Sequence, residues 1–207
     1  MRRPDAREIA LASWFGALYA GTVVGLAPIS FPVVQVRVAD ALLPLSMLFG
    51  RPAIIGFTLG CFIANFFGPL VFPFNLLDAT LGALANFLAC TLAWRKAQEK
   101  RAEGLEDLEG REAFKIMLMM LGVITFIVGT YLPLVFVAVG MPEYIPVIPL
   151  GPIPPILALI MSGWGWIALG TFLAVCVMGY LLFSAVKRLW KRMGLKGALS
   201  IPQAPSS

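Results

Sequence analysis

The feature that most constrains this chain is a series of apolar runs long enough to cross a lipid bilayer. A helix needs about 20 apolar residues to span a hydrocarbon core about 30 Å thick, and several stretches here reach that length. Of the 207 residues, 59% are hydrophobic and 13% are charged, and the mean hydropathy is +0.88, which excludes an ordinary soluble domain. The runs are continuous rather than alternating, so they predict spanning helices and not the strands of a transmembrane barrel.

Prolines, glycines and charged residues divide the apolar sequence into six expected spans. These lie at roughly 8–27, 38–49, 52–67, 77–95, 113–139 and 156–187. The first could be read as a signal peptide, but at about 19 residues it is long for one, and we interpret it as a span. The sequence therefore predicts an all-α integral membrane protein with a single helical domain over residues 1–192. A charged linker at about 96–112 and a basic, disordered tail at 193–207 complete this expectation.

The cations of the chain sort almost entirely to one side of such a bundle. Of the 16 Lys and Arg residues, only Arg37 falls on the other side when six spans are assumed. By the positive-inside rule, both termini are expected in the cytoplasm of a multi-pass plasma-membrane protein. The net charge of +5 then reflects topology, with contact to anionic lipid as a further possibility, and no nucleic-acid partner is expected.

Polar side chains gather at the expected outer, non-basic end. A charge within a span costs about 2.5–3.5 kcal/mol, so such charges usually pair or line a functional cavity. Asp78, Gly82 and Asn86 share one helical face, and the glycine would leave room for a flat solute. Amides match the edge of a purine-like ring, and a carboxylate suits a cationic or N–H donor group. The candidate substrate-binding residues are Gln35, Arg37, Asp40, Asn65, Asp78 and Asn86.

Simpler roles remain open for some of these residues. Arg37 and Asp40 are three apart and could merely neutralise each other on one helical face. Asp78 could complement the positive end of its helix, with Asn75 as the cap. Neither role explains Asn86, which is expected two turns deeper in the same span.

Small residues form a second pattern, on the first apolar run. Ala12, Gly16 and Ala20 recur at spacing four, with Ala17 and Gly21 beside them. Small residues at this spacing allow helices in lipid to approach closely. The face could pack within the bundle itself or receive another membrane subunit, which makes these five residues candidates for partner docking.

Motifs for catalysis and metal binding are missing from the sequence. The chain has no histidine, and its three cysteines lie far apart in apolar segments, so neither a zinc site nor a disulfide framework is indicated. It also lacks a phosphate-binding loop and a dinucleotide-binding turn. No cofactor and no enzymatic activity are expected, and uphill transport would need a partner or an ion gradient.

An ordered series of residues over roughly 9–95 resembles a known family. The series comprises Gly16-Ala17-Leu18-Tyr19, then Gln35, Arg37, Asp40-Ala41-Leu42 and Pro44, then Gly60 with Asn65, and Leu77-Asp78 with Gly82. It resembles the queuosine-precursor transporter (QueT-like) family, whose members are substrate-binding S components of energy-coupling factor (ECF) transporters. Asp40 stands where that family more often has glutamate.

The resemblance implies a six-helix bundle that binds a deazaguanine precursor of queuosine at its outer end. It also implies a transmembrane coupling protein and two ATPase subunits as partners, docked on the small-residue face of the first helix. By resemblance the solute-side residues are Gln35, Arg37, Asp40, Asn65 and Asp78, whereas Asn86 is inferred from its spacing. Three alternatives stay open: an S component for another vitamin, a secondary transporter working alone, and a structural membrane protein without a ligand.

Overall fold

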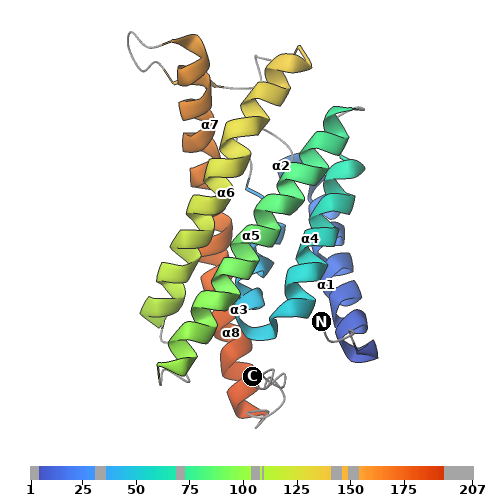
Figure 1. Cartoon of the computed structure of the whole chain (residues 1–207), viewed down its shortest axis with the longest axis vertical. Coiled ribbons are helices and arrows are strands. Elements are labelled where there is room, and N and C mark those ends of the chain that lie inside the picture. The colour runs from blue at the N-terminus through green and yellow to red at the C-terminus, as the bar shows by residue number, and fades with distance from the viewer. Residues whose placement is uncertain are drawn as a thin grey trace, which may run out of the picture.

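The computed structural model describes residues 5–30, 36–68, 73–103, 108, 110–140, 146–148 and 154–193, and helices are the only regular secondary structure in this part of the chain. Its α-helices are α1 (Ala6–Gly25), α2 (Ala27–Ser30), α3 (Ser46–Phe49), α4 (Arg51–Phe66), α5 (Phe74–Ala102), α6 (Gly110–Ala138), α7 (Pro155–Thr171) and α8 (Gly179–Arg192). A 3₁₀ helix, η1 (Val38–Leu45), precedes α3, and a π-helical segment, η3 (Phe172–Met178), joins α7 to α8. Figure 1 shows the long helices running alongside one another as an upright bundle.

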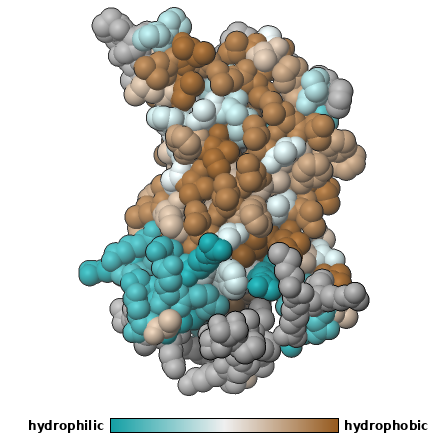
Figure 2. All heavy atoms as spheres, in the orientation of Figure 1, coloured by the Kyte–Doolittle hydropathy of each residue, from teal (hydrophilic) through white to brown (hydrophobic). Residues whose placement is uncertain are grey.

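The expectation of a helical membrane protein is confirmed. Four segments are long and apolar enough to cross a bilayer: α1, α5, α6 and the continuous stretch Pro155–Trp190. The other two expected spans are shorter apolar helices, Val38–Phe49 and Arg51–Phe66. In Figure 2 apolar surface covers the middle and upper parts of the bundle, and hydrophilic residues collect at the lower end.

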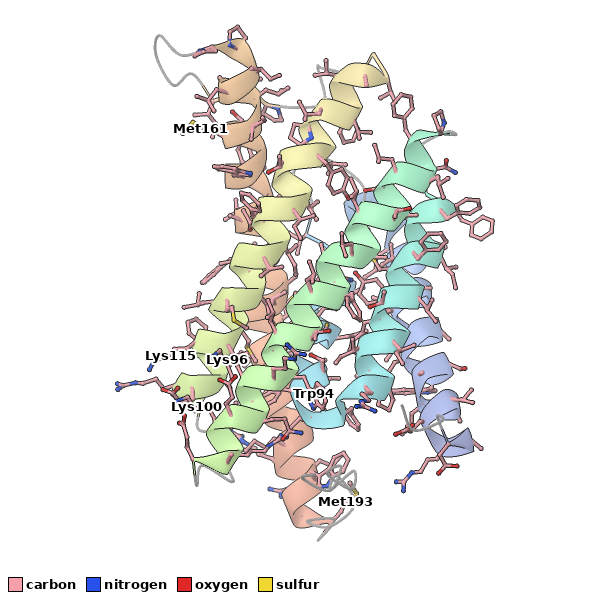
Figure 3. The ribbon with its side chains drawn as sticks, viewed as in Figure 1. Trp94, Lys96, Lys100, Lys115, Met161 and Met193 are labelled. Carbon is pink, nitrogen blue, oxygen red and sulfur yellow. The ribbon has the colours of Figure 1, made fainter. Side chains whose placement is uncertain are left out.

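The first helix begins and the last helix ends at the same end of the bundle, as six passes require (Figure 1). Lys96, Lys100 and Lys115 lie at this end too, where α5 ends and α6 begins (Figure 3). We call it the basic end. Its assignment to the cytoplasm stays a prediction from the charge pattern.

Helix α5 continues to Ala102, through residues expected to begin the charged linker. Ala93 and Ala97 keep one face buried, while ion pairs Lys96–Glu99 (2.7 Å) and Lys100–Glu103 (2.8 Å) support the exposed face. These pairs are three residues apart, the spacing at which side chains meet on a helix. The hydrophobic run therefore predicted the membrane part of α5 but not its polar extension.

The second expected span differs most from the sequence prediction. Residues Val38–Leu45 form a 3₁₀ helix rather than an α-helix, with Pro44 inside it, and only the last four residues of the span are α-helical. Gly50 then turns the chain into α4 with a φ of 62°, a conformation that side chains other than glycine rarely adopt. A Cβ atom at Gly50 would lie 3.0 Å from Trp94 Nε1, so this turn also fits closely against α5.

Helices α1 and α4 cross with their backbones in contact. A Cβ atom added to Gly56 would lie 2.5 Å from the Ala12 carbonyl oxygen, and one added to Gly60 would lie 2.6 Å from the Gly16 carbonyl oxygen. Such crossings give lipid-embedded helices a large van der Waals contact. The crossing sets the position of the inner face of α1, which carries Tyr19, within the bundle.

Candidate functional site

A buried polar cluster lies where η1 meets α1, α4 and α5. Arg37 caps the start of η1, and the Asp40 backbone N–H donates to the Arg37 carbonyl oxygen at 2.8 Å. Asp40 is only 5% exposed. The short second helix therefore carries a guanidinium and a carboxyl group into the bundle interior within a single turn.

The alternative in which Arg37 and Asp40 form a contact ion pair on one helical face is not what the structure shows. None of the ion pairs among the described residues joins them. Instead, Tyr19 on α1 donates its hydroxyl to Asp40 Oδ1 at 2.5 Å, and Arg37 Nη1 contacts Cys61 Sγ at 3.8 Å. Arg37 and Asp40 thus line the same cavity without a contact ion pair.

Asn86 completes a hydrogen-bonded chain through this part of the cluster. Its Nδ2 donates to the Tyr19 hydroxyl oxygen at 3.0 Å, and that hydroxyl donates to Asp40. The amide is 3% exposed and Tyr19 is fully buried. Three elements, α5, α1 and η1, are thus connected by side-chain polar groups inside an apolar bundle.

Asp78 occupies the other part of the cluster. Tyr131 on α6 donates its hydroxyl to Asp78 Oδ1 at 2.6 Å, and the Asn65 amide donates to the Asp78 carbonyl oxygen at 3.4 Å. A Cβ atom at Gly82 would lie 2.6 Å from Asn65 Nδ2. The space that the sequence analysis assigned to a flat solute over Gly82 is therefore filled by the Asn65 amide.

Two polar atoms of the cluster are buried without a hydrogen-bond partner: Arg37 Nε, a donor, and Asn65 Oδ1, an acceptor. A buried polar group left unsatisfied costs about 1–3 kcal/mol. Arg37 also interacts electrostatically with both Asp40 and Asp78, so one cation stands among two carboxyl groups. The cluster has unused hydrogen-bonding capacity of both kinds and an excess of carboxyl groups.

A small cavity adjoins the cluster. It is lined by Arg37 and Asp40 of η1 with Asn86 of α5, and by Ile124 and Val128 of α6 with Ile167 and Thr171 of α7. Its volume is about 20 Å³, enough for a single water molecule. The lining from η1 and α5 is polar, and the lining from α6 and α7 is apolar except for a threonine.

The cluster lies deeper in the bundle than the sequence analysis expected. Asp78 is about 6 Å and Asn86 about 18 Å along α5 from its first residue, at 1.5 Å per residue. Arg37, Asp40 and Asn86 share the cavity, whereas Asn65 is connected to Arg37 through Cys61, and Asp78 is connected to Asn65 through its backbone carbonyl oxygen. Gln35 lies outside the described residues.

Asn75 lies in the first turn of α5 rather than at the cap position, which Pro73 holds, but its Oδ1 accepts from the Leu76 backbone N–H at 2.9 Å while its Nδ2 donates to the Phe66 carbonyl oxygen at 3.0 Å. Sequence reasoning missed Tyr19, Tyr131, Cys61 and Thr171 as parts of the cluster. A tyrosine within an apolar span is a signal that could have identified Tyr19 and Tyr131, because the hydroxyl of a buried tyrosine usually needs a hydrogen-bond partner.

The structure divides the residues proposed for partner docking. Gly16 lies in the crossing with α4, where an added Cβ atom would be 3.2 Å from the Gly56 carbonyl oxygen, and Ala12 and Ala20 are partly buried. Ala17 and Gly21 are exposed, and nothing lies within 4 Å of a Cβ atom at Gly21. Packing inside the bundle thus accounts for Gly16, and only Ala17 and Gly21 keep an open face.

Comparison with known families gives one finding. The family model described as the QueT transporter matches residues 9–188, from α1 into α8. Comparisons with curated proteins and with solved structures give no match. The match includes every described residue of the polar cluster and extends well past residue 95, where the resemblance noted from the sequence ends.

Proposed function

This chain belongs to the QueT transporter family, and we propose that it is the substrate-binding membrane subunit of an ECF transporter that captures a queuosine precursor. The observation that carries the proposal is the polar cluster, in which Asp40, Asp78 and Asn86 are buried inside an apolar bundle and Arg37 lines the same cavity as Asp40 and Asn86. Ionisable groups within a membrane domain are costly and generally serve a solute or ion.

The unsatisfied atoms of the cluster favour a planar nitrogenous heterocycle. A deazaguanine presents a ring carbonyl oxygen, which can accept from Arg37 Nε, and ring or exocyclic N–H groups, which can donate to Asn65 Oδ1. An aminomethyl form adds a cation that suits a carboxyl group. The isoleucine and valine side chains across the cavity would then cover the ring faces.

Binding requires the cavity to widen. At about 20 Å³ it is far below the roughly 300 Å³ at which ligand pockets begin. The apolar wall belongs to α6 and α7, and Tyr131 on α6 is tied to Asp78. We infer that a solute enters as α6 and α7 move away from η1, and that a donor group of the solute then replaces the Tyr131 hydroxyl on Asp78.

A binding measurement with purified protein tests this function. Asp78→Asn should weaken the binding of an aminomethyl deazaguanine at least about tenfold, or 1.4 kcal/mol, because the amide loses the negative charge. Titration calorimetry measures the affinity, and Glu99→Gln provides the control, a carboxyl-to-amide change on the exposed face of the same helix. Equal affinity for Asp78→Asn and the unchanged protein would remove Asp78 from the site.

A ligand screen with the purified protein distinguishes the proposal from its nearest alternative, an S component for another vitamin. A panel of deazaguanines and unrelated vitamins, read by thermal shift, should stabilise the protein only with the deazaguanines. Uptake into proteoliposomes that contain this chain alone distinguishes a secondary transporter, since the proposed subunit needs ATPase partners. Accumulation without ATPase subunits would contradict the ECF assignment.

The open face of α1 is the surface proposed for the coupling partner. Gly21→Leu adds a bulky side chain to this face and should abolish co-purification with the coupling subunit while leaving solute affinity within about twofold. Gly122→Leu on α6 is the matched control, because a Cβ atom there also meets nothing within 4 Å. Intact assembly of the Gly21→Leu variant would refute this docking face.

A further inference from the structure

The small cavity beside the polar cluster is lined by one residue to which the proposed function gives no role, Thr171. It is the last residue of α7, it is 6% exposed, and it lies directly before the π-helical segment η3. Among the described residues, it is the only hydrogen-bonding side chain that α6 and α7 contribute to the cavity, since the others are Ile124, Val128 and Ile167. A buried hydroxyl in an aliphatic lining is costly unless something hydrogen-bonds to it.

The Thr171 hydroxyl is not used for bonding within the described part of the chain. Four other threonines donate their hydroxyls to the backbone carbonyl oxygen four residues earlier: Thr22, Thr58, Thr80 and Thr130. The Thr171 side chain makes no hydrogen bond to any described residue. Thr91 and Thr125 also lack a partner there, but neither of them lines the cavity. The Thr171 hydroxyl is therefore available to a solute.

The π-helical segment holds the last span against η1. The Gly179 backbone N–H donates to the Ala174 carbonyl oxygen, five residues earlier, which is the bonding of a widened turn. A Cβ atom at Gly179 would lie 2.9 Å from the Pro44 Cγ atom, so the span touches η1 directly after η3. Segments of this kind are frequent at functional sites. The last span thus packs on the helix that carries Asp40, and Thr171 and Asp40 line the same cavity.

Helices α6 and α7 are joined closely enough to move as one body. A Cβ atom at Gly163 would lie 2.7 Å from the Gly129 carbonyl oxygen, so the two backbones meet at this crossing. Trp164 Nε1 donates to Thr130 Oγ1 at 2.9 Å across the same interface. When the cavity widens and closes again, Thr171 therefore moves together with the aliphatic residues of both helices. A solute enclosed in this way meets an apolar surface that carries a single hydroxyl.

We propose that Thr171 is a specificity-determining residue of the solute site, whose hydroxyl hydrogen-bonds a polar atom of the heterocycle. This inference rests on the proposed function and deepens it. Arg37 and Asn65 are assigned to polar atoms of the ring edge, and the isoleucine and valine side chains cover faces on which they cannot distinguish an N–H group from a C–H group. A site that hydrogen-bonds a solute group rejects an analogue without that group far more strongly than an apolar lining does. Thr171 therefore makes the lining from α6 and α7 selective as well as apolar.

Titration calorimetry of the purified full-length protein with a deazaguanine and three analogues tests the inference. Each analogue lacks one polar group of the ring system: the exocyclic amino group, the ring carbonyl oxygen or the N–H of the five-membered ring. Thr171→Val removes the hydroxyl at nearly constant shape and should weaken deazaguanine binding about fivefold, the size of one net hydrogen bond. The analogue that lacks the group bonded by Thr171 should bind the variant and the unchanged protein equally.

Two further variants serve as controls. Thr171→Ser keeps the hydroxyl and should retain the deazaguanine affinity within about twofold. Thr91→Val removes a threonine hydroxyl that also has no partner among the described residues, from a position outside the cavity lining, and should leave every affinity unchanged. Because the Thr171 hydroxyl has no bond to lose in the described part of the chain, Thr171→Val should also leave the Tm of the solute-free protein unchanged.

The outcomes separate this inference from the proposed function. Unchanged deazaguanine affinity in Thr171→Val would overturn the inference and leave the proposed function in place. An equal loss of affinity for all four compounds would overturn it too, because the side chain would then act through packing alone. Failure of the unchanged protein to bind any deazaguanine would instead overturn the proposed function, and this inference with it.

Discussion

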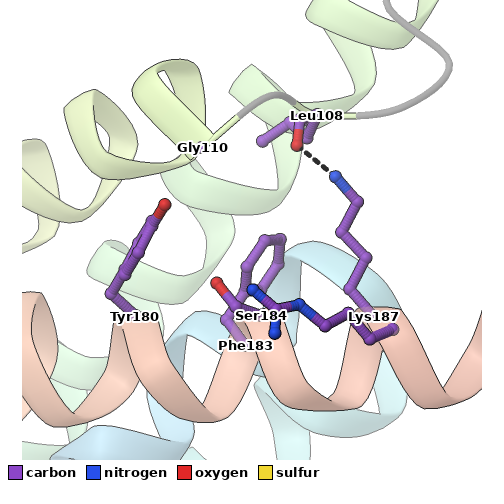
Figure 4. A pocket seen from close by; sticks show the side chains of 7 residues that line it. Leu108, Gly110, Tyr180, Phe183, Ser184 and Lys187 are labelled. Atoms are coloured by element: carbon purple, nitrogen blue, oxygen red, sulfur yellow. Dashed lines mark hydrogen bonds between the residues drawn. The ribbon is translucent and has the colours of Figure 1, made fainter.

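The polar cluster differs from a hollow of about 250 Å³ at the basic end, which we call the basic pocket and which is lined by residues of α8 and of the start of α6 (Figure 4). In the cluster, tyrosine hydroxyls donate to both carboxyl groups, the amides donate to the Tyr19 hydroxyl and to the Asp78 backbone carbonyl oxygen, and the remaining cavity is about 20 Å³. In the basic pocket the volume is open, and Arg188 is exposed. Water can satisfy a cation at the surface of the bundle, whereas a charge inside it must be satisfied by the protein or a ligand. The cluster is therefore closed in this structure, and the basic pocket is open.

The largest expected effect tests how strongly the cluster depends on its own partners. Asp40→Ala removes the acceptor of the Tyr19 hydroxyl and one of two carboxyl groups near Arg37. We expect the free energy of unfolding to fall by about 3 kcal/mol, as when one member of a buried charged network is deleted. Thermal unfolding in detergent measures the change. Asp40→Asn, which keeps an acceptor oxygen, should lose less, and an unchanged Tm for Asp40→Ala would mean that the cluster is not stabilised internally.

An intermediate effect is expected where helix packing supports the cluster. Gly56→Ala places a methyl group against the Ala12 carbonyl oxygen and the Phe15 Cβ atom, at 2.5 and 2.6 Å, and so separates α1 from α4. Overpacking of this kind costs about 1–3 kcal/mol, and because Tyr19 moves with α1, solute affinity should fall as well. Gly21→Ala, where the same methyl group meets open space, should change neither quantity. Similar behaviour of the two variants would show that the crossing does not position the cluster.

The smallest effect on the fold should come from a change in salt concentration. Added salt distinguishes the buried polar cluster from the basic pocket, because it screens exposed charges more than buried ones. Raising the salt concentration from about 0.1 M to about 1 M shortens the screening length from about 10 Å to about 3 Å. Solute affinity at the buried cluster and the Tm in detergent should nevertheless change little, because the charges of the cluster are not exposed to the added ions. Calorimetry measures the affinity, and thermal unfolding measures the Tm. A large decrease in solute affinity at high salt would argue that the cluster is open to solvent.

The sequence predicted those features that depend on local patterns. Hydropathy located α1, α5 and α6 because a span of about 20 apolar residues is itself the signal. Helical spacing placed Asp78 and Asn86 on one face, and both are buried. The match to the QueT transporter family confirms the resemblance noted from the residues of the first half of the chain.

Features that depend on distant contacts were not predictable. The bond between Tyr19 and Asp40 joins residues 21 apart, and that between Tyr131 and Asp78 joins residues 53 apart. The first cannot be inferred without the path of η1, because eight residues with an internal proline give no clear periodicity, and the second depends on how α5 and α6 pack. The alternative of a contact pair between Arg37 and Asp40 failed because it considered only partners on the same helix.

The π-helical segment η3 has a consequence for both regions. It is a wider turn inserted in the last span, between Thr171 at the cavity and the α8 residues at the basic pocket. One residue corresponds to about 100° of rotation around a helix, so the insertion sets the angular offset between α7 and α8. Deleting a single residue from Phe172–Met178 would let the span close into regular α-helix and swing Lys187 and Arg188 away from α6. A register element of this kind allows one continuous span to present Thr171 to the cavity at one depth and Lys187 to the start of α6 at another.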